Sequence, residues 1–149
     1  MDTQVDFSVY DQAGRLAAVA EAKKKPGITR TWAAKWARNF LAHTPRASPA
    51  YLLLVTPRTV YLWNRPDESG DADPTYVFDA DVLFRSYFSR PEADPDRISP
   101  QAFELLVGSW LHDVMRRAWP TAYDQVEPLA ESGFLDAVKD GHVESSGPA

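Results

Sequence analysis

Cysteine is absent from the 149 residues of this chain, which excludes a disulfide framework, a thiolate zinc site and a cysteine nucleophile. No apolar run approaches the roughly 20 residues that cross a bilayer, and no signal peptide opens the chain. The three histidines are scattered without metal-site spacing, and there is no glycine-rich phosphate loop. We therefore expect a cytoplasmic protein with no membrane partner.

Acidic residues outnumber basic ones, 21 to 16, which gives a net charge of −5. The charges are unevenly distributed along the chain. Residues 1–60 contain nine basic and four acidic residues, a net +5, and residues 61–149 contain seven basic and seventeen acidic ones, a net −10. Such asymmetry can mark a binding surface. The acidic total therefore leaves a nucleic-acid partner open, and the N-terminal part is where that partner would approach.

Length and composition predict a single globular domain over residues 1–149. Alternation predicts a hairpin of strands 6–11 and 16–23. A helix through 16–23 is the alternative, because its alanines are poor strand formers. We expect a helix from Thr29 or Thr31 to about 42, with Trp32, Trp36 and Phe40 on its apolar side and Ala33 and Ala37 as further candidates for that side. Strands are expected over 51–55 and 59–63.

The second half of the chain begins with an acidic loop over residues 64–75. Residues 76–88 suggest a short strand followed by a helical turn. Ser99 is a good N-cap, and apolar residues at helical spacing predict a helix from there to about 117. We expect a shorter helix over 129–138 and a frayed polar tail from Gly141 onward.

The predicted hairpin carries the residues with candidate chemistry. Glu21 and Lys23 are two apart, so a strand directs both side chains to one face. A four-residue loop at 12–15 places Asp6 opposite Glu21. Two carboxylates about 5 Å apart can hold a hard cation such as Mg²⁺ or Mn²⁺. Beside them, Lys23 could orient water and stabilise charge that develops on a phosphoryl group.

This order, an aspartate, a strand–turn–strand unit and then Glu-x-Lys, resembles the PD-(D/E)xK nuclease superfamily over about residues 5–63. The resemblance implies an α/β, restriction-endonuclease-like fold, with a mixed central sheet flanked by helices. It places the core at about residues 5–63 and additional C-terminal helices in an extension at about 76–140. It implies Asp6, Glu21 and the Ala22 carbonyl as Mg²⁺ or Mn²⁺ ligands and Asp6, Glu21 and Lys23 as catalytic residues. Members commonly have a helix before the aspartate strand that supplies another acidic residue, and here residues 1–5 precede Asp6.

The function expected from these features is hydrolysis of phosphodiester bonds in DNA or RNA. A single site cuts one strand, so double-strand cleavage would require a homodimer or a second event. Basic residues near the hairpin are the candidate nucleic-acid contacts: Lys24, Lys25, Arg30, Lys35 and Arg38.

Two other interpretations stay open. The same fold could serve as an inactive module that binds a protein or a nucleic acid, and the −10 half could dock on a basic protein. The charged residues of the hairpin could also form an ordinary solvated strand face, where exposed ion pairs contribute little.

Overall fold

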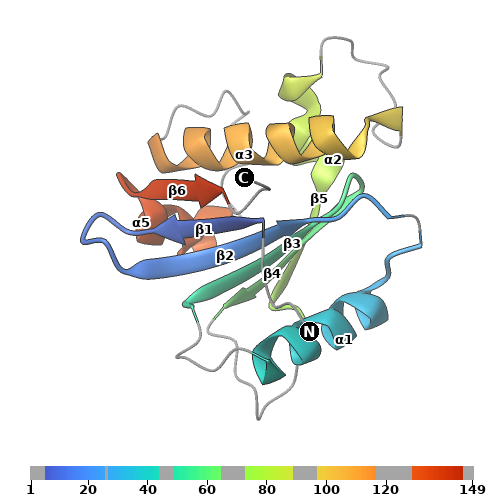
Figure 1. The fold of residues 1–149 in the computed structure, drawn as a ribbon, viewed down its shortest axis with the longest axis horizontal. Helices are drawn as coiled ribbons and strands as arrows, with labels where there is room; N and C mark the ends of the chain where they lie inside the picture. The colour runs from blue at the N-terminus through green and yellow to red at the C-terminus, as the bar shows by residue number, and fades with distance from the viewer. Residues whose placement is uncertain are drawn as a thin grey trace.

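The computed structural model describes residues 6–25, 27–43, 49–64, 73–88, 97–116 and 129–145. A six-stranded sheet runs through this part of the chain (Figure 1). Its order is β5-β4-β3-β2-β1-β6, with β2 and β3 parallel and every other neighbouring pair antiparallel. The strands are β1 (Phe7–Tyr10), β2 (Leu16–Ala22), β3 (Tyr51–Val55), β4 (Thr59–Asn64), β5 (Tyr76–Asp79) and β6 (His142–Ser145).

Helices cover both faces of the sheet, with α1 on one face and α3 on the other (Figure 1). This arrangement confirms the α/β class and the mixed central sheet flanked by helices. The helical elements are α1 (Arg30–Ala42), α2 (Ala80–Phe84), the 3₁₀ turn η1 (Arg85–Tyr87), α3 (Pro100–Arg116) and α5 (Phe134–Val138). No helix within the described ranges is long and apolar enough to cross a membrane.

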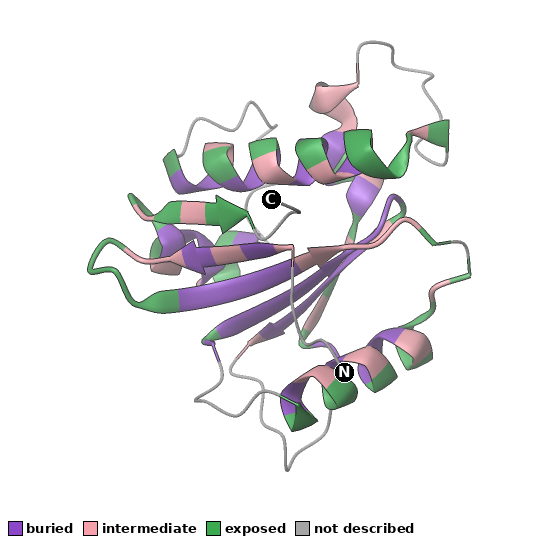
Figure 2. Cartoon of the chain, in the orientation of Figure 1, coloured by how far each residue is buried: buried purple, intermediate pink, exposed green. Residues whose placement is uncertain are grey.

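The central strands form the core because their side chains are apolar on both faces. All five residues of β3 are buried, as the continuous run from Tyr51 to Val55 predicts (Figure 2). In β2, Ala18 and Ala20 pack in the cluster under α3, whereas Val19 packs in the cluster under α1. The alanines that weakened the strand prediction lie in close-packed positions, and the alternative helix through 16–23 is wrong.

Helix α1 connects the two parallel strands and begins as the sequence predicts. The Thr29 hydroxyl caps the helix by accepting a hydrogen bond from the Trp32 N–H at 3.1 Å. Ala33 and Ala37 are fully buried, while Trp32 and Trp36 pack only partly against the cluster. The predicted apolar side is correct, but its small residues lie deepest, which lets the helix approach the sheet closely.

The C-terminal part differs most from the expectation. The frayed tail expected from Gly141 onward is wrong, because residues 142–145 form β6 along the open edge of β1. The Tyr10 and His142 rings stack there, 4.9 Å apart. The expected helix over 129–138 is confirmed over residues 129–131 and 134–138, but it is interrupted at Gly133, which has a φ of +85° and precedes α5. Of the expected acidic loop, residues 65–72 lie outside the described ranges.

Candidate metal and phosphodiester site

The β1–β2 hairpin brings Asp6 beside Glu21. Phe7 pairs with Ala20, so the antiparallel register carries Asp6, the preceding residue, to Glu21. This is the pairing that the sequence predicts. The two carboxylates also interact electrostatically, because Asp6 raises the pKa of Glu21 after the larger effect of burial.

The turn of the hairpin differs from the predicted four-residue loop. Tyr10, and not Asp11, pairs with Leu16, and the register shifts between Val9 and Tyr10. The strand pairing beyond this bulge is the expected one, since Val9 pairs with Ala18. A β-bulge therefore absorbs the longer loop and leaves the far end of the hairpin unchanged.

Glu21 and Lys23 lie on one face at the carboxyl end of β2. The Lys23 Nζ is 3.3 Å from the Glu21 Oε2, with side-chain exposures of 38% and 18% respectively. They share the sheet face of Val19, which packs under α1. The glutamate is thus largely withdrawn from water, while the ammonium group remains accessible to a ligand.

Asp6 also contacts the third residue of the predicted metal site. Its Oδ2 accepts a hydrogen bond from the Ala22 N–H at 2.8 Å. The N–H and C=O of one strand residue point to the same side, so the Ala22 carbonyl also faces β1. The structure therefore gathers the four predicted site residues, Asp6, Glu21, Ala22 and Lys23, at one end of the hairpin.

Glu104 of α3 is a site residue that sequence reasoning missed. Burial raises the pKa of this carboxyl, and the charge of Asp6 raises it further. The helix is held close to β1 at Gly108, one turn later, where an added Cβ would lie 3.2 Å from the Phe7 ring. A glycine within a helix often marks such a close approach. Gly108 is the signal in the sequence that could have pointed to this approach of α3 to β1.

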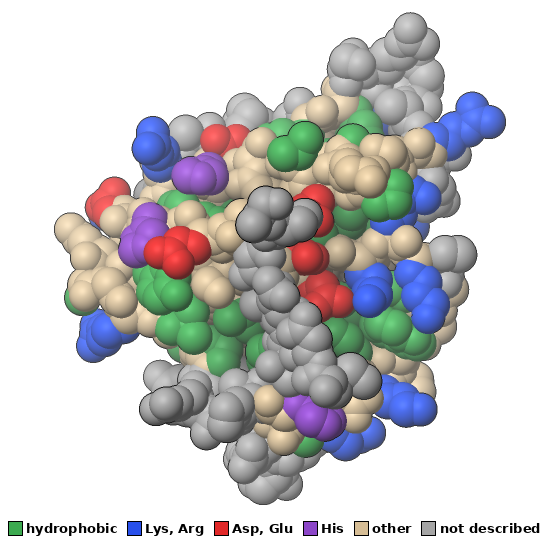
Figure 3. Space-filling model, in the orientation of Figure 1, with side chains coloured by type: hydrophobic (Ala, Val, Ile, Leu, Met, Phe, Trp, Pro, Cys, Tyr) green, Lys and Arg blue, Asp and Glu red, His purple; other side chains and the backbone are tan. Residues whose placement is uncertain are grey.

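Asp6 and Glu21 thus lie together at the end of the sheet, with Lys23 beside Glu21, and the charge of Asp6 also acts on Glu104 of α3. For Glu21, burial is the main cause of the raised pKa, and Lys23 opposes it. Figure 3 shows acidic side chains in the middle of this face with Lys and Arg side chains next to them. Carboxylates held together in a partly buried site favour either protonation of one carboxyl group or binding of a cation between them.

The chemistry of these donors fits a hard divalent ion. Carboxylate and carbonyl oxygens are the ligands that Mg²⁺ and Mn²⁺ prefer. In the part of the chain that the structure describes, no three or more His, Cys, Asp or Glu side chains already converge on one point. Asp6 accepts the Ala22 N–H and Glu21 pairs with Lys23. Ion binding would therefore require rotation of side chains within the site.

The five predicted nucleic-acid contacts lie in two places. Lys24 and Lys25 line a hollow of about 410 Å³ next to the site, with the Lys25 Nζ 5.1 Å from the centre of the Trp32 ring. The other three lie on α1, where Lys35 and Arg38 are exposed on its outer side. Arg30 donates to the Pro74 carbonyl at 3.4 Å. The structure groups the lysines that follow β2, and it does not bring the three α1 residues into that hollow.

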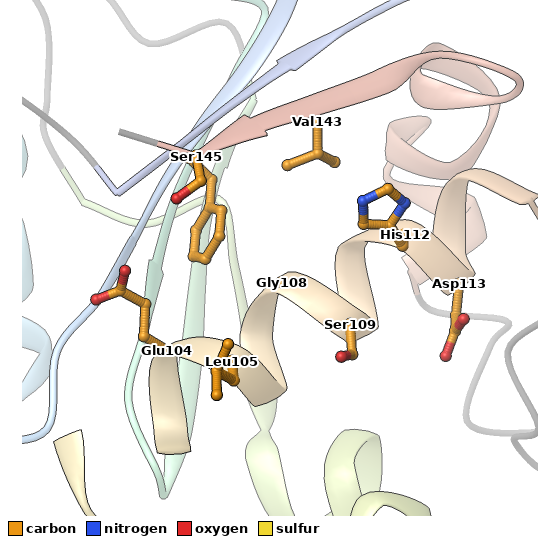
Figure 4. A pocket seen from close by; sticks show the side chains of 9 residues that line it. Glu104, Leu105, Gly108, Ser109, His112, Asp113, Val143 and Ser145 are labelled. Atoms are coloured by element: carbon orange, nitrogen blue, oxygen red, sulfur yellow. The ribbon is translucent and has the colours of Figure 1, made fainter. Parts of the chain in front are cut away.

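A second hollow of about 430 Å³ lies between α3 and β6. Glu104 stands at one end of it, and His112 and Asp113 stand at the other (Figure 4). Asp113 accepts a hydrogen bond from the Tyr87 hydroxyl at 2.5 Å, and burial followed by this bond raises the pKa of Tyr87. The end of this hollow that contains Glu104 is the end on which the charge of Asp6 acts.

Comparison of the chain with protein-family models, with curated proteins and with solved structures gives no match. The candidate function therefore depends on the geometry of Asp6, Glu21, Ala22, Lys23 and Glu104.

Proposed function

We propose that this protein is a metal-dependent nuclease that hydrolyses phosphodiester bonds of DNA or RNA, with DNA as the leading substrate. The observation that carries the proposal is the meeting of Asp6 with Glu21 and Ala22 at the carboxyl end of β2. Asp6 contacts the Ala22 N–H at 2.8 Å, and Lys23 lies 3.3 Å from Glu21. Ligand sites in α/β sheets commonly lie at the carboxyl ends of parallel strands, and β2 is parallel to β3.

The order of the elements supports a restriction-endonuclease-like core. The β1–β2 hairpin is followed by the crossover helix α1 and the β3–β4 hairpin. This is the order that the PD-(D/E)xK resemblance implies. Helix α3, which comes later in the sequence, packs against Phe7 of β1 and carries Glu104 into the electrostatic range of Asp6. In this proposal, Glu104 supplies the acidic group that a helix before the aspartate strand commonly supplies.

Asp6, Glu21 and the Ala22 carbonyl would hold Mg²⁺ or Mn²⁺, with Glu104 as a further acidic neighbour. When bound, the ion supplies Lewis acidity toward a phosphate oxygen and lowers the pKa of a coordinated water. Asp6 and Glu21 are held near each other by strand pairing, so each lowers the electrostatic cost of bringing a cation to the other.

Lys23 would act on the phosphate and on the attacking water. Its ammonium is 38% exposed on the side chain and is anchored by Glu21, so it can turn toward a phosphate oxygen without leaving the site. A positive charge placed there stabilises the charge that develops during phosphoryl transfer. With Glu21 engaged as a metal ligand, its ion pair with Lys23 would weaken, and the Lys23 ammonium would be available to the substrate.

The test is cleavage of plasmid and of single-stranded DNA with Mg²⁺ or Mn²⁺. We expect the wild type to cleave and Glu21→Gln to lose at least about 100-fold, because it removes one ligand charge without changing side-chain volume. Glu144→Gln is the matched control, since Glu144 is exposed on β6, where it pairs with His142. No cleavage by the wild type, or equal cleavage by Glu21→Gln, contradicts the proposal.

The second candidate is an inactive module with the same fold. The ion pair of Glu21 with Lys23 and the hydrogen bond from Ala22 to Asp6 favour it, because both carboxylates have partners within the chain. A module of this kind would bind its partner without hydrolysis and without dependence on Mg²⁺. The cleavage experiment separates the two candidates directly.

A further inference from the structure

The carboxyl ends of β2 and β3 form one continuous edge, and a basic hollow lies immediately beyond it. Ala22 pairs with Val55, and the Lys23 N–H donates to the Val55 carbonyl at 2.8 Å. The residues that follow each strand are therefore neighbours in space. Lys24 and Lys25 come from the β2 side, and Thr56 and Arg58 come from the β3–β4 turn.

The turn holds Arg58 in a defined position. The Thr56 hydroxyl accepts hydrogen bonds from the Thr59 N–H at 2.8 Å and from the Arg58 N–H at 3.3 Å, and it donates to the Thr59 carbonyl at 2.8 Å. The Arg58 carbonyl accepts from the Ala80 N–H at 3.1 Å. Thr56 is buried, whereas the Arg58 side chain is exposed. The backbone of the turn is therefore fixed, and the exposed Arg58 side chain starts from a defined position at the rim of the hollow.

The electrostatics of the hollow favour an anion. Its described lining contains three basic side chains, those of Lys24, Lys25 and Arg58, and no acidic one. Helix α1 begins at Arg30, just beyond this lining, and its first turn contains no acidic residue, so its positive end adds to the potential. Asp79, which pairs with Thr59 on the neighbouring strand, accepts the Asp81 N–H as the N-cap of α2.

We propose that this hollow binds a phosphate of the nucleic-acid strand next to the phosphate at the Asp6–Glu21 site. The inference rests on the proposed function, and it names the surface that positions the substrate. Arg58 is the residue that this proposal adds, because the planar N–H donors of its guanidinium match the oxygens of a phosphate group. One strand would then run from the carboxylates, past Lys23, to Lys24 and Arg58, which are consecutive along the same sheet edge.

Binding is measured by fluorescence anisotropy with a labelled single-stranded DNA 12-mer in EDTA, so that no cleavage occurs. We expect Lys24→Ala and Arg58→Ala each to weaken binding about two- to fivefold, as for loss of one exposed charge contact. The double variant should weaken it at least about fivefold and reduce the slope of log affinity against log salt by about 1.4. Matched controls are Arg15→Ala and Lys139→Ala, because both residues border a hollow at the opposite end of β2.

This inference would be overturned if Lys24→Ala, Arg58→Ala and the double variant bound the DNA as tightly as the wild type. It would also be overturned if the wild type did not bind, or if the two controls weakened binding by the same factor. Its failure is distinguishable from failure of the nuclease proposal. A protein that binds through Arg58 but never cleaves DNA contradicts only the nuclease. A protein that cleaves through Glu21 and binds equally well without Lys24 and Arg58 contradicts only the phosphate hollow.

Discussion

Replacement of Asp6 by alanine or by asparagine separates the structural role of this carboxylate from its proposed role in catalysis. The Asp6 carboxylate accepts the partly buried Ala22 N–H at 2.8 Å. Alanine removes the acceptor, whereas asparagine keeps a carbonyl oxygen at the same place and removes only the charge. The two variants therefore share the loss of a metal ligand but differ in what they do to the hairpin.

The expected magnitudes follow from this one contact. A hydrogen bond to a charged group contributes about 1.5–3 kcal/mol to stability. For a chain of this length, each kcal/mol shifts the melting temperature by about 2–4 °C. Asp6→Ala should therefore melt about 3–12 °C below the wild type. Asp6→Asn should lose less than about 1.5 kcal/mol, because it keeps a neutral hydrogen bond and removes the repulsion from Glu21 and Glu104.

The assay is thermal and urea unfolding of the three proteins without metal, followed by DNA cleavage with Mg²⁺. We expect the order wild type, Asp6→Asn, Asp6→Ala in stability and a loss of cleavage in both variants. Equal melting of Asp6→Ala and the wild type would refute the structural account of the Ala22 contact. Full cleavage by a well-folded Asp6→Asn would refute the proposed ligand role.

Three further changes test the site and the core. Burial raises the pKa of Glu21, so the folded state holds the proton of Glu21 more tightly, and the stability of the wild type should fall as pH rises above about 4.5. In urea unfolding, the stability of Glu21→Gln should lack this part of the pH dependence, and parallel pH profiles of the two proteins would contradict the prediction. Gly133→Ala puts a Cβ 2.6 Å from the Tyr51 hydroxyl at a φ of +85° and should cost at least about 2 kcal/mol in urea unfolding; a loss below 1 kcal/mol would contradict this packing. Trp110→Ala empties a fully buried position against Phe84 and should cost about 3–5 kcal/mol in the same assay; a loss below about 1.5 kcal/mol would show that the position is not core.

The local part of the candidate site could be predicted because it depends on short-range pattern. Period-two alternation places Glu21 and Lys23 on one face of β2, and the antiparallel register places Asp6 beside Glu21. The predicted turn was wrong by one pairing, yet the site geometry survives, because the register beyond the bulge at Val9 and Tyr10 is the predicted one. A hairpin is specified more strongly by its buried face than by its loop.

The parts that could not be predicted depend on contacts between distant segments. Strand β6 forms because β1 has an open edge, which nothing in the sequence near Gly141 reveals. The charge of Asp6 acts on Glu104 only because α3 packs on the face that contains Phe7 and the β2 alanines. Arg58 joins Lys24 only because β2 and β3 are parallel and end together. Each of these requires the topology, not the local sequence.

Calorimetric titration with Mn²⁺ tests most directly whether Asp6 and Glu21 form one cation site. We expect an ion to bind to the wild type and to the control Glu144→Gln, and we expect the heat of binding to be lost in both Asp6→Asn and Glu21→Gln. The absence of wild-type binding, or equal binding by the two carboxylate variants, would contradict this expectation.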